Sequence, residues 1–299
     1  MLITVDVGPA GAVSGHAHER DGDWARAARG VEVLRDALKA HEDELGSALP
    51  ATWFVRADAI VARQLGDRCA LVRGLAPVLD PLRAAGHEHG WMPQIYSGLD
   101  AGVDHADLAA THAALAGAGF APASVRMGGC FHDDDSMAAL EALGVRHDCS
   151  ALPGRHKTDG GWRADWRGTP ATPYRPSRAD YRVPGTPARA LLELPLSMVA
   201  IAAPYDAAPL ARYVDLAYHP PLLADAMAGL AARDAVVALV HPDTLLPAPA
   251  DGGHPLLAYD TAALRHHLRA LREAAARLGR GCRFETVSGF AARLADAPA

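Results

Sequence analysis

The sequence predicts an α/β protein, folded as a single-domain (β/α) barrel over residues 1–299. Short apolar segments alternate with longer segments in which apolar residues recur every three or four positions, the pattern of a helix with one buried face. Glycine turns follow three of the helical segments, at Gly86, Gly119 and Gly144. This alternation is typical of a parallel sheet with crossover helices, and a chain that is 50% hydrophobic can bury one large core.

The expected elements follow one another from the first residue. Residues 1–7 form an apolar strand that contains Asp6 near its end and leads into a turn at Gly8 and Pro9. Further strands are expected at 51–58, 86–96, 124–131, 191–198 and 236–242, and helices at 24–45, 71–84, 105–118, 136–143 and 259–278. Residues 283–286 and 287–294 are expected to add a closing strand and helix.

One segment interrupts this rhythm. Residues 153–187 are rich in Arg, Trp, Tyr, Pro and Gly, and they are too many for a simple connection. Catalytic groups of such barrels lie at the C-terminal ends of the strands. We therefore expect the segment to form a lid or rim over a site, or a surface excursion packed by its own aromatic side chains.

Charge and composition exclude several classes of partner. A net charge of −6 and a pI near 6.2 leave no basic surface for nucleic acid or an anionic membrane. No apolar run approaches the roughly 18 residues that a membrane span requires, and no charged-then-apolar leader precedes the first strand. We expect a cytoplasmic protein with a small-molecule or sugar-like partner; the sequence does not indicate the oligomeric state.

The cysteines show no metal or disulfide signature. No CxxC pair occurs among Cys69, Cys130, Cys149 and Cys282. We expect reduced, mostly buried thiols. A cysteine nucleophile at Cys130 or Cys149 is the alternative, although no recognisable cysteine–histidine pairing supports it.

Six short motifs carry a resemblance to a known family. In chain order they are MLITVDVG, ATWFVRAD, GHEHGWMPQIY, SVRMGGCF, LLELPLSM and VVALVHP. Together they resemble the NodB-homology or polysaccharide deacetylase family, carbohydrate esterase family 4, over nearly the whole chain. The resemblance implies a deformed (β/α) barrel and an enzyme that hydrolyses an amide or N-acetyl group.

The family mechanism uses a metal that this chain is not equipped to hold in the inherited way. In the resembled enzymes one Asp and two His hold a divalent ion, a second Asp acts as base and a late His as acid. Here Val7 stands at the Asp ligand position, and Met92 with either Tyr96 or Gln94 stands at the His positions. Thioether, phenol and amide are poor ligands for such an ion, and valine has no ligand atom. We therefore expect catalysis without the family metal and without a cofactor.

The resemblance nevertheless leaves a coherent polar set in place. Asp6 keeps the position of the base, Arg126 that of the arginine that orients the base, and His241 that of the late acid. Asp243 is a candidate to orient His241. A carboxylate and an imidazole can move protons without a metal. The structural alternatives are a helix cap for Asp6 and a core histidine for His241.

Other side chains are expected to contact substrate. They are Glu88, Trp91, Tyr96 and Asp148. Packing against the barrel is an equal alternative for the tryptophan, and Asp148 is also a candidate member of the network around Asp6.

Two H-x-H pairs offer a relocated zinc site. They are His16 with His18 and His87 with His89, and His132 is a fifth candidate. Alternate residues of a strand share a face, so His87 and His89 both point inward or both point away. With 15 histidines in the chain, however, some clustering arises by chance.

The sequence thus predicts an enzyme acting on a C–N bond, amide or N-acetyl, of a sugar-like or small metabolite substrate. Since a fold does not fix a function, two rivals stay open. One is a catalytically inactive barrel that binds a glycan or a partner protein. The other is a non-hydrolytic isomerase or cyclase.

Overall fold

A computed structural model describes residues 1–8, 24–96, 102–158, 163–250 and 252–296. Seven parallel strands form its main sheet, in the order β11-β1-β2-β3-β4-β5-β8. The strands are β1 (Leu2–Val7), β2 (Ala51–Arg56), β3 (Glu88–Met92), β4 (Ser124–Val125), β5 (His147–Asp148), β8 (Leu192–Glu193) and β11 (Val237–Val240).

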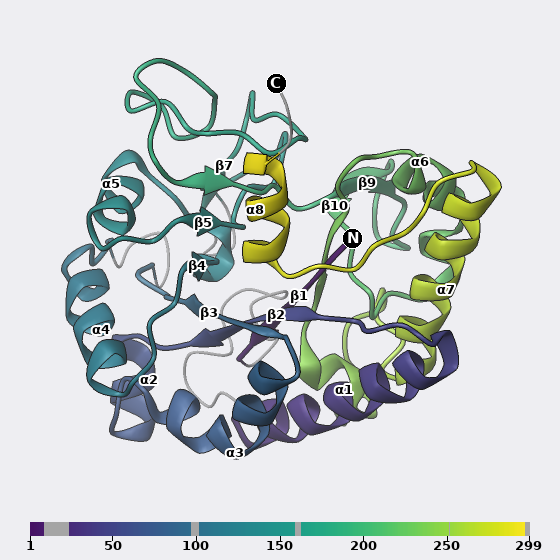
Figure 1. The fold of residues 1–299 in the computed structure, drawn as a ribbon, viewed down its shortest axis with the longest axis horizontal. Helices are drawn as coiled ribbons and strands as arrows, with labels where there is room; N and C mark the ends of the chain where they lie inside the picture. The colour runs from purple at the N-terminus through teal and green to yellow at the C-terminus, as the bar shows by residue number, and fades with distance from the viewer. Residues whose placement is uncertain (9–23, 97–101, 159–162, 251, 297–299) are drawn as a thin grey trace.

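Helices lie around the outside of this sheet (Figure 1). They are α1 (Trp24–Leu45), α2 (Ala59–Leu65), α3 (Ala70–Ala84), α4 (Ala106–Gly117), α5 (Asp134–Ala142), α6 (Met227–Ala231), α7 (Thr261–Arg277) and α8 (Val287–Asp296). Two small antiparallel pairs complete the regular structure: β6 (His156–Lys157) with β7 (Ala164–Asp165), and β9 (Met198–Ile201) with β10 (Leu210–Tyr213).

The sheet curls into a deformed barrel, as predicted. Irregular backbone bridges the space between β8 and β11. The N–H of Ser197, shortly after β8, donates to the carbonyl of Val237 at 2.9 Å. The N–H of Leu239 donates to Val214 at 2.9 Å, and Leu216 donates back to Leu239 at 2.8 Å. Backbone hydrogen bonds therefore continue past the edge of β11.

The strands at the centre of the sheet are buried on both faces, which explains their nearly continuous apolar sequences. Inside the barrel, Phe54 fills the space that Gly90 leaves open on the neighbouring strand. A Cβ atom at Gly90 would lie 2.5 Å from the Phe54 ring. The glycine of the GHEHGW motif is therefore required by packing, and the phenylalanine forms part of the floor beneath the site described below.

Several expected elements differ in the structure. The strand expected at 86–96 ends at Met92, before Pro93, which has no backbone N–H to donate to a neighbouring strand. Residues 283–286 are not a strand. Strand β5 and the β9–β10 pair were not predicted, since each is a short segment with little alternation of apolar and polar residues.

The segment 153–187 is packed by its own aromatic side chains. Trp166, Tyr174 and Tyr181 are buried, and the rings of Trp166 and Tyr181 meet edge to face with centroids 5.1 Å apart. The indole N–H of Trp166 also donates to the carbonyl of Cys130 at 2.9 Å. The segment therefore touches the loop after β4, at the end of the barrel where the strands finish.

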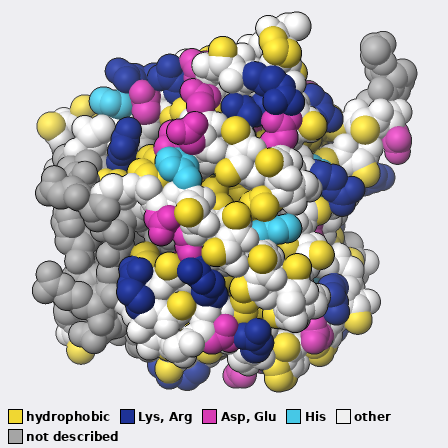
Figure 2. Space-filling model, turned by 90° about the vertical axis from the view of Figure 1, so that its left-hand side faces the viewer, with side chains coloured by type: hydrophobic (Ala, Val, Ile, Leu, Met, Phe, Trp, Pro, Cys, Tyr) yellow, Lys and Arg dark blue, Asp and Glu magenta, His cyan; other side chains and the backbone are white. Residues whose placement is uncertain are grey.

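On the face drawn in Figure 2, acidic and basic side chains are interspersed, and no large patch of one sign appears on it. Among the described residues, none of the helices has the length and apolar character needed to cross a membrane.

Candidate active site

Asp6 lies near the end of β1 with its side chain toward the barrel interior. It pairs with Phe54 of β2, and Thr4 lies one layer below on the same face. Only 7% of Asp6 is exposed. A carboxylate this deeply buried requires partners, and two cationic side chains from distant parts of the chain provide them.

The first partner is Arg126, which directly follows β4 and is fully buried. Its Nη1 donates to Oδ1 of Asp6 at 3.1 Å, and its Nη2 donates to the Thr4 hydroxyl at 2.9 Å. Its Nε donates to the carbonyl of Cys149 at 2.9 Å, and the guanidinium carbon lies 4.9 Å from the centre of the Phe54 ring. Arg126 therefore crosses the interior and fixes one oxygen of Asp6.

The second partner is His241, which directly follows β11 and is 8% exposed. Its Nε2 lies 3.9 Å from Oδ2 of Asp6, and its Nδ1 lies 3.9 Å from Oδ2 of Asp215. Both distances are too long for direct hydrogen bonds but fall within ion-pair range. The imidazole is therefore held between two carboxylates, with its Nε2 on the Asp6 side.

This environment favours the charged form of His241. Burial lowers its pKa, but Asp215, Asp6 and Asp243 outweigh burial and raise the pKa above its ordinary value. Asp215 contributes more than Asp243, which was the orienter predicted from the sequence. Asp243 acts in the same direction, so its role as an orienter stays a prediction beside that of Asp215.

Helix α1 fixes the backbone that carries His241. The chain after His241 forms a short 3-10 helix, η5 (Pro242–Leu245), which packs directly on α1. A Cβ atom at Gly30 of α1 would lie 2.4 Å from the carbonyl carbon of Pro242. The glycine thus allows the close approach that holds the histidine in place.

The charge of Asp6 also acts on two weakly acidic groups, the Tyr213 phenol and the Cys130 thiol. Burial first, then Tyr218, Asp215, Cys130 and Asp6, raise the pKa of Tyr213 well above its usual value, so its phenol stays protonated. Burial likewise raises the pKa of Cys130 to about 12 and that of Cys149 well above its ordinary value. Neither thiol becomes a thiolate near neutral pH, which removes the support for a cysteine nucleophile.

Asp148 lies outside this cluster. It is level with Val125, whereas Arg126 is the next residue along, so the two side chains leave opposite faces of the sheet. Asp148 lies 2.5 Å from Nε2 of His132 and accepts a hydrogen bond from the Ser150 N–H at 3.0 Å. It is fully buried and its charge acts on Arg126 through space, so these contacts give it a structural role and the predicted substrate contact stays a prediction.

Trp91 and Tyr96 are packing residues. Trp91 is fully buried on the face opposite Arg126, and its indole N–H donates to the carbonyl of Ala57 at 2.9 Å. Tyr96 is 3% exposed and stacks on Phe131 with ring centroids 5.2 Å apart. Core packing, the alternative stated for the tryptophan, accounts for both side chains.

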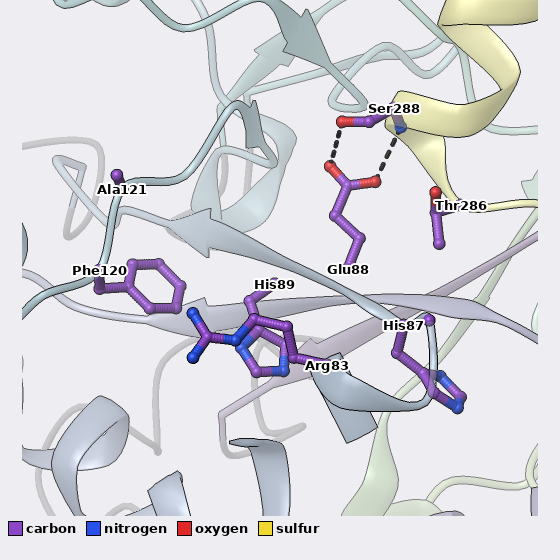
Figure 3. Close-up of a pocket in the computed structure, with 9 residues that line it drawn as sticks. Arg83, His87, Glu88, His89, Phe120, Ala121, Thr286 and Ser288 are labelled. Atoms are coloured by element: carbon purple, nitrogen blue, oxygen red, sulfur yellow. Dashed lines mark hydrogen bonds between the residues drawn. The ribbon is translucent and has the colours of Figure 1, made fainter. Parts of the chain in front are cut away.

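Glu88 and the histidines beside it lie at the wrong end of the barrel for the predicted role. Glu88 is the first residue of β3, and its carboxylate accepts hydrogen bonds from the Ser288 N–H at 2.8 Å and from the Ser288 hydroxyl at 2.7 Å. It therefore anchors the start of α8 beneath the barrel. Figure 3 shows these bonds beside a cavity of about 260 Å³ that His87 and His89 also line.

Among the residues that the structure describes, the side chains lining this cavity do not form a metal site. Nδ1 of His87 accepts from the N–H of Ala51 at 3.1 Å and from the indole of Trp53 at 3.2 Å, so its role is structural. His89 stacks on Phe120. His16 and His18, the other predicted zinc ligands, lie outside the described residues.

The family metal does not fit the side chains around Asp6. Val7 projects to the opposite face of β1, and the methyl group of Met92 would be 3.1 Å from a Cβ atom at Gly8. Gln94 donates to the carbonyl of Tyr96. No group of three or more His, Cys, Asp or Glu suited to a metal occurs in the part of the chain that the structure describes.

The structure places Asp6, Arg126 and His241 next to one another, as the sequence grouped them, and adds Asp215 and Tyr213, which the sequence analysis did not include. Both precede β11, Tyr213 as the last residue of β10 and Asp215 in the irregular chain after it, and neither belongs to a recognisable motif. The sequence did contain one indication of them: Tyr213 and Asp215 are two residues apart, the spacing of side chains that share a face of an extended chain.

Neither a family model nor a curated protein matches the chain significantly. A solved structure from Mycobacterium smegmatis, described as a candidate polysaccharide deacetylase, matches at 20% identity with a TM-score of 0.53 and covers 99% of this chain and 89% of that one. At that identity the match shows the fold alone, and it confirms the barrel of the polysaccharide deacetylase type.

Two further solved structures match with lower TM-scores. One is a family 4 carbohydrate esterase from Streptomyces lividans in complex with acetate, at 13% identity and a TM-score of 0.42, covering 92% of this chain and 88% of that one. The other is a candidate polysaccharide deacetylase involved in O-antigen biosynthesis from Bordetella bronchiseptica, at 13% identity and a TM-score of 0.38, covering 92% and 89%.

Proposed function

We propose that this protein hydrolyses a C–N bond, an amide or N-acetyl group, in a sugar-like or small metabolite substrate without the family metal. The observation that carries the proposal is the placement of Asp6 and His241, with Nε2 of His241 3.9 Å from Oδ2 of Asp6. The fold shared with a candidate polysaccharide deacetylase supports the same reaction class.

The two side chains divide the proton transfers. Asp6 accepts a proton from water as the water oxygen attacks the amide carbonyl carbon. His241 donates its Nε2 proton to the amide nitrogen as the C–N bond breaks, giving a carboxylic acid and an amine. Because Asp6 then holds a proton and His241 has lost one, transfer between them restores both groups.

The surroundings suit these roles. Arg126 occupies Oδ1 of Asp6 and leaves Oδ2 facing His241. The three carboxylates near His241 keep it charged, which is the state that a general acid requires. The 3.9 Å separation leaves both groups without a direct hydrogen bond to each other, so each is available to substrate.

The test is turnover of a panel of N-acetylated amino sugars and small acetamides, with acetate and free amine measured in parallel. Equal amounts of the two products are expected from the wild-type protein. D6N and H241A should each lower kcat by about 10²–10⁴, the range for loss of general acid–base catalysis. The control is D234N, because Asp234 is fully exposed in its pair with Arg280 and precedes β11, so it lies at the opposite end of that strand from His241.

The rival functions give different results. An inactive binding barrel releases no acetate from any member of the panel, and that result contradicts the proposal. An isomerase or cyclase changes its substrate without the added mass of water, which mass spectrometry detects.

A further inference from the structure

Hydrolysis without a metal requires another group to stabilise the negative charge that develops on the carbonyl oxygen. In metal-free amide hydrolysis this role belongs to hydrogen-bond donors fixed around that oxygen, and each is worth a large factor in rate. The inference below rests on the proposed function and concerns which group of this chain fills the role.

The cations beside Asp6 are already committed. Nη1, Nη2 and Nε of Arg126 donate to Asp6, Thr4 and the carbonyl of Cys149. The guanidinium is also fully buried, so a substrate does not reach it. His241 has to deliver its proton to the leaving nitrogen and is not a fixed donor to oxygen.

Tyr213 faces the same interior space. Asp215 pairs in parallel with Leu239, and Leu239 pairs with Thr4 of β1, which places Asp215 on the face that carries Thr4 and Asp6. Tyr213 is the last residue of β10, two residues before Asp215. Val214 between them donates to Ser197 at 2.8 Å and accepts from Leu239 at 2.9 Å, so the chain continues extended and we infer that the two side chains share a face. Its ring stacks on Tyr218, with centroids 6.4 Å apart and planes inclined by 21°, and this contact fixes the direction of the phenol.

The hydroxyl of Tyr213 is an uncommitted donor. No hydrogen bond within the described ranges uses it, and Tyr213 is partly exposed, unlike Arg126. The charges of Asp6 and Asp215 contribute to the raised pKa of the phenol, which agrees with a position near the proposed base. A phenol that stays protonated donates a hydrogen bond without adding a charge to the interior.

We propose that the Tyr213 hydroxyl donates a hydrogen bond to the carbonyl oxygen of the scissile amide and stabilises the oxyanion formed when water attacks. The O–H bond is not broken in this step, since the tyrosine gives a hydrogen bond and not a proton. Tyr213 thus takes over the charge-stabilising role that the metal performs in the resembled enzymes, and it does so from a strand that holds none of the family motifs.

The experiment compares Y213F with Y218F, which removes a hydroxyl from the neighbouring stacked ring. For Y213F we expect kcat to fall by about 10²–10³, as on removal of one oxyanion donor, with KM changed less than about threefold. A phosphonate analogue of the tetrahedral intermediate should bind more weakly to Y213F in proportion to the loss in kcat/KM. Y218F should retain wild-type values, and circular dichroism should show both variants folded.

The outcomes separate this inference from the proposed function. If Y213F turns over substrate as fast as the wild-type protein, or binds the analogue equally tightly, the proposed role of Tyr213 is wrong and the proposed function is unaffected. If kcat falls more in Y218F than in Y213F, the donor is Tyr218 and the role proposed for Tyr213 is wrong. Absence of wild-type turnover across the panel overturns both.

Discussion

The ion pair between Arg126 and Asp6 allows a direct measurement of how much the free energy of unfolding depends on pairing the buried charges. R126M keeps a long apolar stem but removes the guanidinium that serves Asp6, Thr4 and the carbonyl of Cys149. Asp6, at 7% exposed, then loses its nearest cation. Removing one partner of a buried pair costs about 3–5 kcal/mol, because the other charge stays buried without compensation.

Urea denaturation followed by tryptophan fluorescence measures this cost, since Trp53, Trp91 and Trp166 are all buried reporters. The double variant R126M/D6N should be less destabilised than the sum of the two single variants, because it leaves no unpaired charge. R293M is the control. Arg293 is 45% exposed in its pair with Glu285, and such a pair contributes less than about 1 kcal/mol. A loss below about 1 kcal/mol for R126M would refute this account of the interior.

Four further predictions concern stability, proton transfer and metal. Burial and Asp148 raise the pKa of Glu193 well above 4.5, so the folded protein holds a proton that the unfolded chain releases. The stability that this proton contributes is complete below pH 4.5 and declines as pH rises toward the folded pKa. E193Q should flatten that decline when urea midpoints are measured as a function of pH. D215N should lower the pKa of His241, so the alkaline limb of the rate profile, where the acid loses its proton, should move to lower pH; an unmoved limb would show that another group is the acid. G30A should destabilise the protein by about 1–3 kcal/mol, since its methyl group meets the backbone after His241, whereas G74A, which meets nothing within 4 Å, should not; equal thermal shifts for the two would contradict the close approach. Dialysis against a chelator should leave turnover unchanged, and stoichiometric zinc that H87A/H89A releases would contradict the structural role of those histidines.

The barrel was predictable because its signals are local. Apolar strands and three-to-four-residue periodicity each extend over several residues, and the helices 24–45 and 259–278 appear within a residue or two of the expected bounds. Strand β5 has only two residues, and its position depends on hydrogen bonds to β4 and β8. No window of sequence contains that information.

The difference between local and long-range information also explains which site residues were placed correctly from the sequence and which were not. Asp6 lies near the end of β1 and His241 directly follows β11, and the two strands are adjacent in the sheet, so a prediction of strand ends was enough to bring the two residues together. Glu88 and His87 were misplaced because the predicted strand 86–96 was treated as a single unit. The structure places its beginning at the opposite end of the barrel from Asp6. Which end of a strand a residue occupies depends on where the strand starts, and sequence patterns locate strand starts poorly.

The buried charges also bear on whether the barrel is a catalyst or a scaffold. A barrel that only had to fold has no need of Asp6 and Arg126 in its interior, because apolar side chains of similar volume are often neutral or stabilising in place of a buried ion pair. The packing around the pair is already apolar, with Phe54 against the guanidinium. Charges placed where they give little stability, beside a histidine held in its acid form, favour a chemical role for this end of the barrel. If D6N/R126M proves as stable as the wild-type protein yet loses all turnover, stability and activity will have been separated at a single pair of residues.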